Sequence, residues 1–253
     1  MHWDFALILF ILAIIVPALG RRRIRILLEL RDTSKSDRLS LYASTIALQW
    51  LFAAVILWRV SRHAIRPEQL GLGFSATPTV ITITVVVSSA ILALQLISLR
   101  RLKSDPVALT GETVQMALKV FPRDGIERLC FTVLVCTVAI CEEFIYRGFV
   151  QYVFKAWSGS WSVGIVGSSL LFSVAHLYQG NRGLASTFGV GVLFAGVRAW
   201  TGSLVPTVVA HFVADLTIGF LAPRRILAAL AKASNGKAAS QGHSTVSPGT
   251  SRE

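Results

Sequence analysis

The sequence predicts an all-α fold, a polytopic integral membrane bundle of about seven transmembrane helices. Three observations lead to this prediction. Hydrophobic residues make up 53% of the 253 residues and charged residues only 15%, whereas a soluble domain carries about 25% charged residues. Seven apolar runs have 17 to 26 residues each, and about 20 residues suffice for a helix to cross a bilayer. The alternating pattern of a membrane β-barrel is absent, which leaves helices as the spanning elements.

The seven apolar runs are separated by loops of very different length. They are 3–19, 39–58, 79–99, 129–154, 161–177, 184–200 and 203–222. The first run lacks a basic segment before it and is followed at once by RRRIR at 21–25. Because such charges resist translocation, we expect a retained anchor rather than a cleaved signal peptide.

Lysine and arginine are distributed unevenly between the two sides of this topology. With the N-terminus outside, the inner loops and tail carry 19 of the 25 basic residues and the outer loops carry five. Because cytoplasmic loops are enriched in basic residues, we expect the C-terminus in the cytoplasm and the plasma (inner) membrane of a prokaryote as the location. Contacts of the basic loops with membrane lipids account for the net charge of +12, so no nucleic acid partner is expected.

Loop length and composition divide the chain into three parts. Residues 1–124 form an N-terminal transmembrane region of about three helices with cytoplasmic loops, and a short amphipathic helix is expected at 112–120. Residues 125–222 form a second domain, in which tight connections predict that the last four helices are antiparallel neighbours. Residues 223–253 are basic and rich in small polar residues, which predicts a disordered cytoplasmic tail.

Ionisable residues that are costly in a bilayer gather in the second domain. They are Glu142, Glu143, Arg147, His176, His211 and Asp215. A charged group at the centre of a bilayer costs roughly 2.5–3.5 kcal/mol on insertion scales. Glu143 and Arg147 are four residues apart, so they share a helix face and can pair. Glu142 is turned by about 100° from Glu143 and need not share that pair.

Two further helices contribute polar residues at a similar spacing. His211 and Asp215, in HFVAD, are four residues apart on one helix face. His176 ends FSVAH, with Phe172 one turn before it. Glu142 and His211 lie about a dozen residues from the inner ends of their segments and His176 only a few, a difference in depth of order 10 Å at 1.5 Å per residue.

These polar groups could be structural or functional. A buried ion pair and a few isolated polar packing residues would explain them separately, whereas one shared cavity in the last four helices explains them together. A glutamate in an apolar cavity can act as a general base for water, and imidazole N–H groups can stabilise an oxyanion. This combination suits hydrolysis of an amide in an active-site cavity.

Two alternatives use the same residues differently. Glutamate, histidine and aspartate are also zinc ligands, so a divalent metal could be bound by Glu142, His176, His211 and Asp215. A membrane protein with a polar cavity could also be a transporter or a non-enzymatic immunity scaffold that binds a partner. The absence of an internal repeat in the sequence argues against a transporter.

Three motifs carry a resemblance to a known family. EEFIYR at 142–147 resembles EExxxR, FSVAH at 172–176 resembles FxxxH, and HFVAD at 211–215 resembles HxxxN or HxxxD. All three are motifs of the CAAX prenyl protease and bacteriocin-processing family, also called ABI or CPBP intramembrane proteases. They occur in the family's order, and the resemblance covers roughly 125–220.

The resemblance implies an intramembrane endopeptidase that hydrolyses a peptide bond of a membrane-associated protein or peptide. It implies that Glu142 activates the water with help from His176, that Glu143 and Arg147, with Phe172, are supporting residues, and that His211 and Asp215 form the oxyanion side. The family's chemistry is either a glutamate-activated water or a bound metal, and both remain open at this point.

One position departs from the common pattern of the family. Many members have Asn where this chain has Asp215. Asn donates a hydrogen bond at any pH, whereas an ionised Asp only accepts. Asp215 must therefore be protonated, or orient His211, or ligate a metal.

Overall fold

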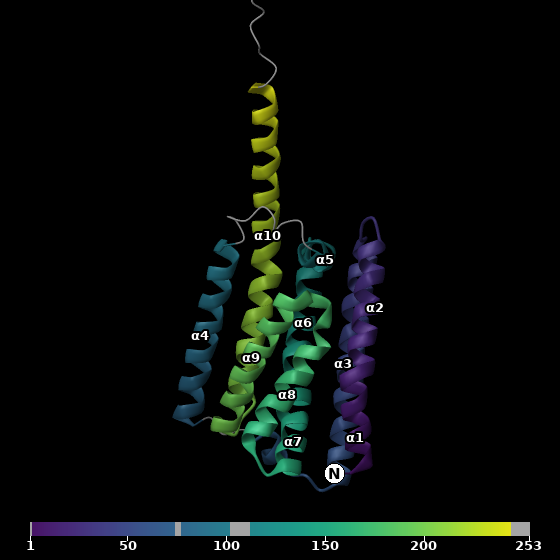
Figure 1. Cartoon of the computed structure of the whole chain (residues 1–253), viewed down its shortest axis with the longest axis vertical. Helices are drawn as coiled ribbons and strands as arrows, with labels where there is room; N and C mark the ends of the chain where they lie inside the picture. Colours follow the sequence, from purple (N-terminus) through teal and green to yellow (C-terminus); the bar gives the residue numbers. More distant parts are fainter. Residues whose placement is uncertain (1, 74–76, 102–111, 244–253) are drawn as a thin grey trace, which may run out of the picture.

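The protein is an all-helical bundle in the computed structural model, which describes residues 2–73, 77–101 and 112–243; this part of the chain contains no strand (Figure 1). Six helices here are long and apolar enough to cross a membrane: Trp3–Glu29, Lys35–Arg62, Pro78–Arg100, Gly125–Ser158, Leu177–Thr201 and Val205–Ala228. The remaining predicted segment, 161–177, corresponds to a shorter apolar helix, Trp161–Ala175. The predicted fold class, a helical membrane bundle, is confirmed.

The first three spanning segments are long, mainly apolar helices. Helix α1 (Trp3–Phe10), the π-helix η1 (Ile11–Ile15) and α2 (Val16–Glu29) follow one another without a break. Helix α3 (Lys35–Arg62) begins with a capping box, in which Ser34 and Asp37 satisfy each other's backbone N–H groups. Helix α4 (Pro78–Arg101) packs mainly against α10 (Val205–His243).

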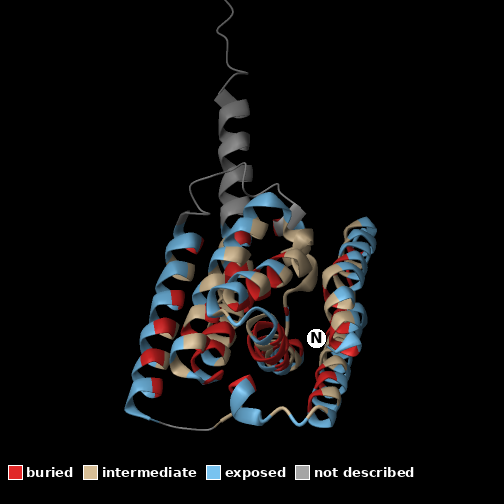
Figure 2. Cartoon of the chain, turned by 60° about the horizontal axis from the view of Figure 1, so that its bottom comes forward, coloured by how far each residue is buried: buried red, intermediate tan, exposed pale blue. Residues whose placement is uncertain are grey.

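The second half supplies the centre of the bundle. Helix α6 (Gly125–Glu142), the π-helix η5 (Glu143–Val150) and α7 (Gln151–Ser158) form one long rod. Of its most apolar 18-residue stretch, 56% is buried, against at most 33% for the other spanning helices. Figure 2 shows the same concentration of buried residues in the middle of the bundle. The rod is therefore the element around which the others pack.

Helix α8 is shorter than the spanning helices. Helix α8 has only 15 residues (Trp161–Ala175), so its length is about 22 Å, less than the roughly 30 Å of a hydrocarbon core. The chain then turns through the 3-10 helix η6 (Leu177–Gln179) into α9 (Gly180–Thr201). In Figure 1 this turn lies below the upper ends of α3 and α10. His176 directly follows the last residue of α8 and is partly buried.

Close backbone contacts hold this half together. Gly191 of α9 faces Ser169 of α8, and a Cβ at Gly191 would lie 3.1 Å from the Cβ of Ser169. Gly148 in η5 faces the end of η2 (Pro67–Leu70), where a Cβ would lie 3.1 Å from the carbonyl oxygen of Leu70. At both sites a Cβ would be unusually close to the neighbouring segment, so glycine favours the close approach.

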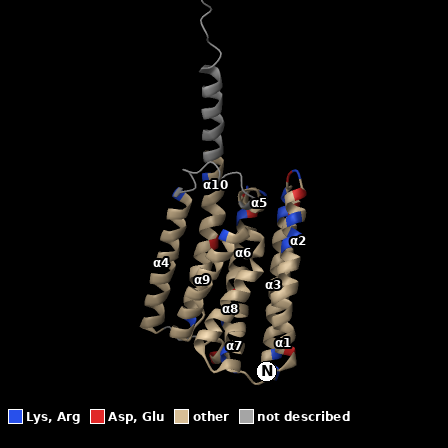
Figure 3. Ribbon diagram, in the orientation of Figure 1, with Lys and Arg blue, Asp and Glu red and all other residues tan. Residues whose placement is uncertain are grey.

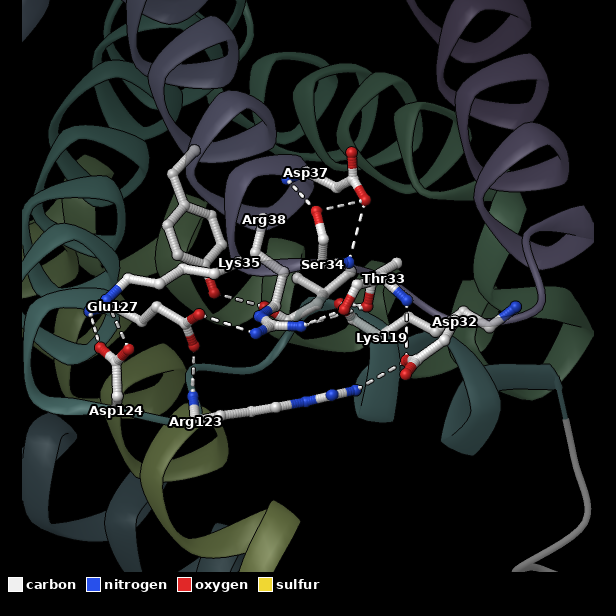
Figure 4. Close-up of polar contacts among 12 residues, drawn as sticks. Asp32, Thr33, Ser34, Lys35, Asp37, Arg38, Lys119, Arg123, Asp124 and Glu127 are labelled. Carbon is white, nitrogen blue, oxygen red and sulfur yellow. Dashed lines mark hydrogen bonds and ion pairs between the residues drawn. The ribbon is translucent and has the colours of Figure 1, made fainter.

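Charged residues concentrate at the two ends of the bundle (Figure 3). At the upper end, α5 (Glu112–Val120) coincides with the predicted amphipathic helix, and Lys119 donates to the carbonyl oxygens of Leu27 and Leu28 at the end of α2. Figure 4 shows the network that joins the α2–α3 loop to the start of α6. Its centre is the buried pair of Arg38 and Glu127, with Nη2 and Oε1 2.7 Å apart.

The C-terminal segment differs from the expected tail. Helix α10 continues past residue 222, through Pro223, to His243, where the composition predicts a disordered tail from 223 onward. The run ILAALAKA at 226–233 consists largely of strong helix formers, which explains why the helix continues. Residues 244–253 of the predicted tail lie outside the described residues.

Candidate active site

The supporting pair lies at the start of the π-helix. Glu143 and Arg147 have side-chain exposures of 0% and 1%, and Nη1 of Arg147 donates to Oε1 of Glu143 at 3.0 Å. π-Helical segments are frequent at functional sites, and η5 contains both partners of this pair. The structure thus has the pair that the spacing of four residues predicts.

Glu143 also binds a residue from a distant helix. Nδ1 of His211, on α10, lies 2.9 Å from the same Oε1 atom of Glu143. Nε2 of His211 faces Oδ2 of Asp215 at a longer distance of 3.5 Å. Both ring nitrogens of His211 therefore face carboxylates. The spacing of HFVAD predicts the second of these contacts and not the first.

Glu142 stands apart from this cluster of charges. Its Oε1 accepts a hydrogen bond of 3.0 Å from Nε2 of Gln49, on α3. Its Oε2 is buried and has no hydrogen-bond partner among the described residues. A buried carboxylate oxygen without a donor is costly unless something binds there. Oε2 of Glu143 is also buried without a partner among the described residues, but the other oxygen of Glu143 binds Arg147 and His211. Oε2 of Glu142 is therefore the unpartnered oxygen of the carboxylate that is not held in an ion pair.

His176 presents one defined ring nitrogen to the site. Its Nδ1 lies 2.8 Å from the carbonyl oxygen of Phe172. Because a carbonyl oxygen only accepts, Nδ1 must carry the proton and donate it. In neutral His176 the lone pair is then on Nε2, which can accept a hydrogen bond from water.

Phe172 lies between candidate site residues of three helical segments. Its ring lies 4.6 Å from the ring of His176 and 6.3 Å from that of His211, centroid to centroid. The guanidinium carbon of Arg147 lies 4.0 Å from the centre of the Phe172 ring. The same carbon lies 5.5 Å from the centre of the ring of Phe194, on α9. The two aromatic rings hold a buried cation by cation–π contacts, and Phe172 places His176 one ring away from His211.

The four candidate metal ligands are not arranged around a common point. Within the described residues, no group of three or more His, Cys, Asp or Glu side chains could hold a metal ion. A histidine binds a metal through a ring nitrogen lone pair, but both nitrogens of His211 face the carboxylates of Glu143 and Asp215. The side chains as they stand do not fit a divalent metal.

Two residues of the site have no counterpart in the motifs. Gln49, in the N-terminal region, donates a hydrogen bond to Glu142. Phe194 of α9 contacts the guanidinium of Arg147, and its ring centroid lies 6.2 Å from that of His211. Gln49 is the single amide in the apolar run ALQWLFAAVILW at 47–58, a signal that could have marked it. Phe194 carries no such signal, because aromatic residues are common in spanning helices.

Comparison with known proteins agrees with the three motifs. The family model described as type II CAAX prenyl endopeptidase Rce1-like matches residues 126–217. No curated protein and no solved structure matches the chain. The matched segment runs from the beginning of α6 into α10 and includes Glu142, Glu143, Arg147, Phe172, His176, His211 and Asp215. The predicted resemblance is thereby confirmed: the segment of this membrane protein that holds the candidate site is similar to the type II CAAX prenyl endopeptidases of the Rce1-like model.

Proposed function

We propose that the protein is an intramembrane endopeptidase that uses a glutamate-activated water to hydrolyse a peptide bond of a membrane-associated protein or peptide. The observation that carries this proposal is the state of Glu142. One of its oxygens accepts from Gln49, while the other is buried without a partner. A carboxylate so placed can bind a water molecule and take its proton.

In the proposed mechanism, each of the surrounding residues has a separate role in hydrolysis. Nε2 of His176 accepts the second hydrogen of the water and so aims its oxygen at the substrate carbonyl carbon. As the C–O bond forms, the proton moves to Glu142 and negative charge collects on the carbonyl oxygen. Nδ1–H of His211 stays bound to Glu143, while Nε2–H, which lies 3.5 Å from Asp215 and is only loosely held there, donates to that oxyanion. The C–N bond then breaks, and Glu142 returns its proton to the leaving amine.

Glu143 and Arg147 keep the site in place without touching the substrate. Arg147 balances the charge of Glu143 at 3.0 Å, and Glu143 in turn holds His211 at 2.9 Å. The proposal requires no metal, because the side chains named as candidate ligands already have other partners or do not converge.

The orientation in the membrane is part of the proposal. The N-terminus and the end of α10 lie at opposite ends of the bundle (Figure 1), as an odd number of passes requires. The excess of basic residues on the side of the α2–α3 and α4–α6 loops supports a cytoplasmic location for that side. The N-terminus is then outside, in the plasma (inner) membrane of a prokaryote.

Purified protein in lipid vesicles tests the proposal directly. The probes are a farnesylated peptide that ends in a CAAX sequence and a set of unmodified amphipathic peptides, with the products identified by mass spectrometry. We expect cleavage by the wild type and by Glu29→Gln, an exposed matched control, and no cleavage by Glu142→Gln. Failure of the wild type to cut any probe would favour a non-enzymatic cavity protein, and loss of cleavage on chelation would favour a metal mechanism.

A further inference from the structure

We infer that Gln49 is a positioning residue for Glu142: it holds Oε1 of the carboxylate so that Oε2 faces the water. This inference rests on the proposed function of Glu142. Gln49 lies on α3, outside the segment of 126–217 that matches the family. Its amide nitrogen donates to Oε1 of Glu142 at 3.0 Å, while Oε2 remains buried and without a partner among the described residues.

A second bond fixes Gln49 relative to α6. Nε1 of Trp50, the next residue, donates to Oγ1 of Thr137 at 3.3 Å. Thr137 and Glu142 are both on α6, and α3 packs along this helix. Two adjacent residues of α3 therefore bind two positions of α6, so the amide of Gln49 is held in register with the carboxylate. Positioning groups are most effective when they are carried by rigid elements of this kind.

An amide suits this position because it donates without carrying charge. An arginine or lysine would form an ion pair with Glu142 and make it a weaker base. A neutral donor orients one oxygen and leaves the carboxylate free to accept a proton on the other. The choice of Gln rather than an apolar residue in this membrane helix is explained by that requirement.

Gln49→Met tests the inference, because methionine keeps the length and loses the donor. We expect kcat to fall about 10- to 100-fold, the range that follows from misplacing a catalytic group by about 1 Å, with KM within about twofold. Gln49→Asn keeps the amide on a shorter side chain and should fall between Gln49→Met and wild type. Gln95→Met, the same change in α4, is the matched control and should cleave like wild type.

Infrared difference spectroscopy supplies a readout that a structural role would not change. The spectrum of wild type minus Glu142→Gln isolates the carboxylate band of Glu142, and we expect this band to shift in Gln49→Met and to stay in place in Gln95→Met. If wild type cleaves the probes and Gln49→Met retains kcat within about twofold, or if its carboxylate band is unmoved, the inference about Gln49 is overturned alone. If wild type cleaves nothing, the proposed function fails together with it.

Discussion

Nδ1 of His211 lies 2.9 Å from Oε1 of Glu143, the same oxygen that accepts from Arg147. A single carboxylate oxygen therefore links a buried cation on η5 to an imidazole on α10. The second glutamate of the motif serves two partners, so its loss should affect both the stability of the bundle and the placement of His211. This double dependence separates Glu143 from its neighbour Glu142.

Glu143→Gln should destabilise the protein more than Glu142→Gln, although the chemical change is identical. The first substitution leaves Arg147 buried without its anion, and breaking a buried pair costs roughly 3–5 kcal/mol. The second replaces a carboxylate that is bound only by Gln49. Thermal unfolding of both variants in detergent measures the difference. Equal unfolding temperatures would show that Glu143 is not the anchor of the cluster.

Arg147→Ala should lower the yield in membranes and cause early thermal unfolding, whereas Arg147→Lys should lie between it and wild type. Lysine retains the charge that Glu143 needs, but it lacks the planar guanidinium that lies against the rings of Phe172 and Phe194. The unfolding temperatures of the three proteins test this order. An Arg147→Ala protein as stable as wild type would contradict the role of the pair.

Local spacing accounts for the parts of the site that the sequence predicts. Glu143 pairs with Arg147 because residues four apart share a helix face, and the apolar runs give the spanning helices because each is long enough to cross a bilayer. The contact of His211 with Glu143 joins residues 68 positions apart. No local rule predicts such a contact, which depends on how α10 packs against the central rod.

The unpredicted features come from tertiary structure. The π-helix η5 cannot be predicted from the pattern of apolar residues. A π-helical turn and an α-helical turn can have the same amino-acid composition. The depth of His176 depends on α8 being short, and the predicted boundary at 177 differs from the observed end at Ala175 by only two residues. The extension of α10 through Pro223 is unexpected because proline normally ends or kinks a helix.

The cap of α6 predicts a pH-dependent contribution to stability. The backbone N–H of Glu127 and the ammonium of Lys35 hold the pKa of Asp124 below its usual range. The carboxylate therefore stabilises the folded state above the pKa of the unfolded chain, about 3.9, and this contribution is lost as the pH falls through the lower pKa of the folded state.

Two substitutions at Asp124 separate the cap from the ion pair. Asn can accept from the N–H of Glu127 as Asp does, so Asp124→Asn should lose only the contact with Lys35, while Asp124→Ala should lose both and unfold at a lower temperature. The difference between wild type and Asp124→Asn should be complete above about pH 5 and shrink below about pH 4. Thermal unfolding curves of wild type and Asp124→Asn across this pH range measure the difference in stability. A difference that does not change with pH would exclude the ion pair with Lys35 as its cause.

Asp215 can decide between a glutamate-activated water and a bound metal as the mechanism. Its Oδ2 lies 3.5 Å from Nε2 of His211, and its side chain is 36% exposed, so it is a loose neighbour rather than a tightly bound partner. If its function is to orient His211 or to donate to an oxyanion, Asn can replace it, because an amide donates at any pH. We therefore expect Asp215→Asn to keep its activity or to extend it to higher pH.

The metal mechanism predicts the opposite result for the same variant. Asn would replace an anionic ligand by a weaker neutral one, so metal affinity would fall and a chelator would inactivate Asp215→Asn sooner than wild type. The experiment is a pH–activity profile of both proteins with and without chelator. Because both nitrogens of His211 face carboxylates, we expect chelator to leave both profiles unchanged. An inactive Asp215→Asn protein that regains activity on addition of zinc would reverse this conclusion and make the protein a metal-dependent protease.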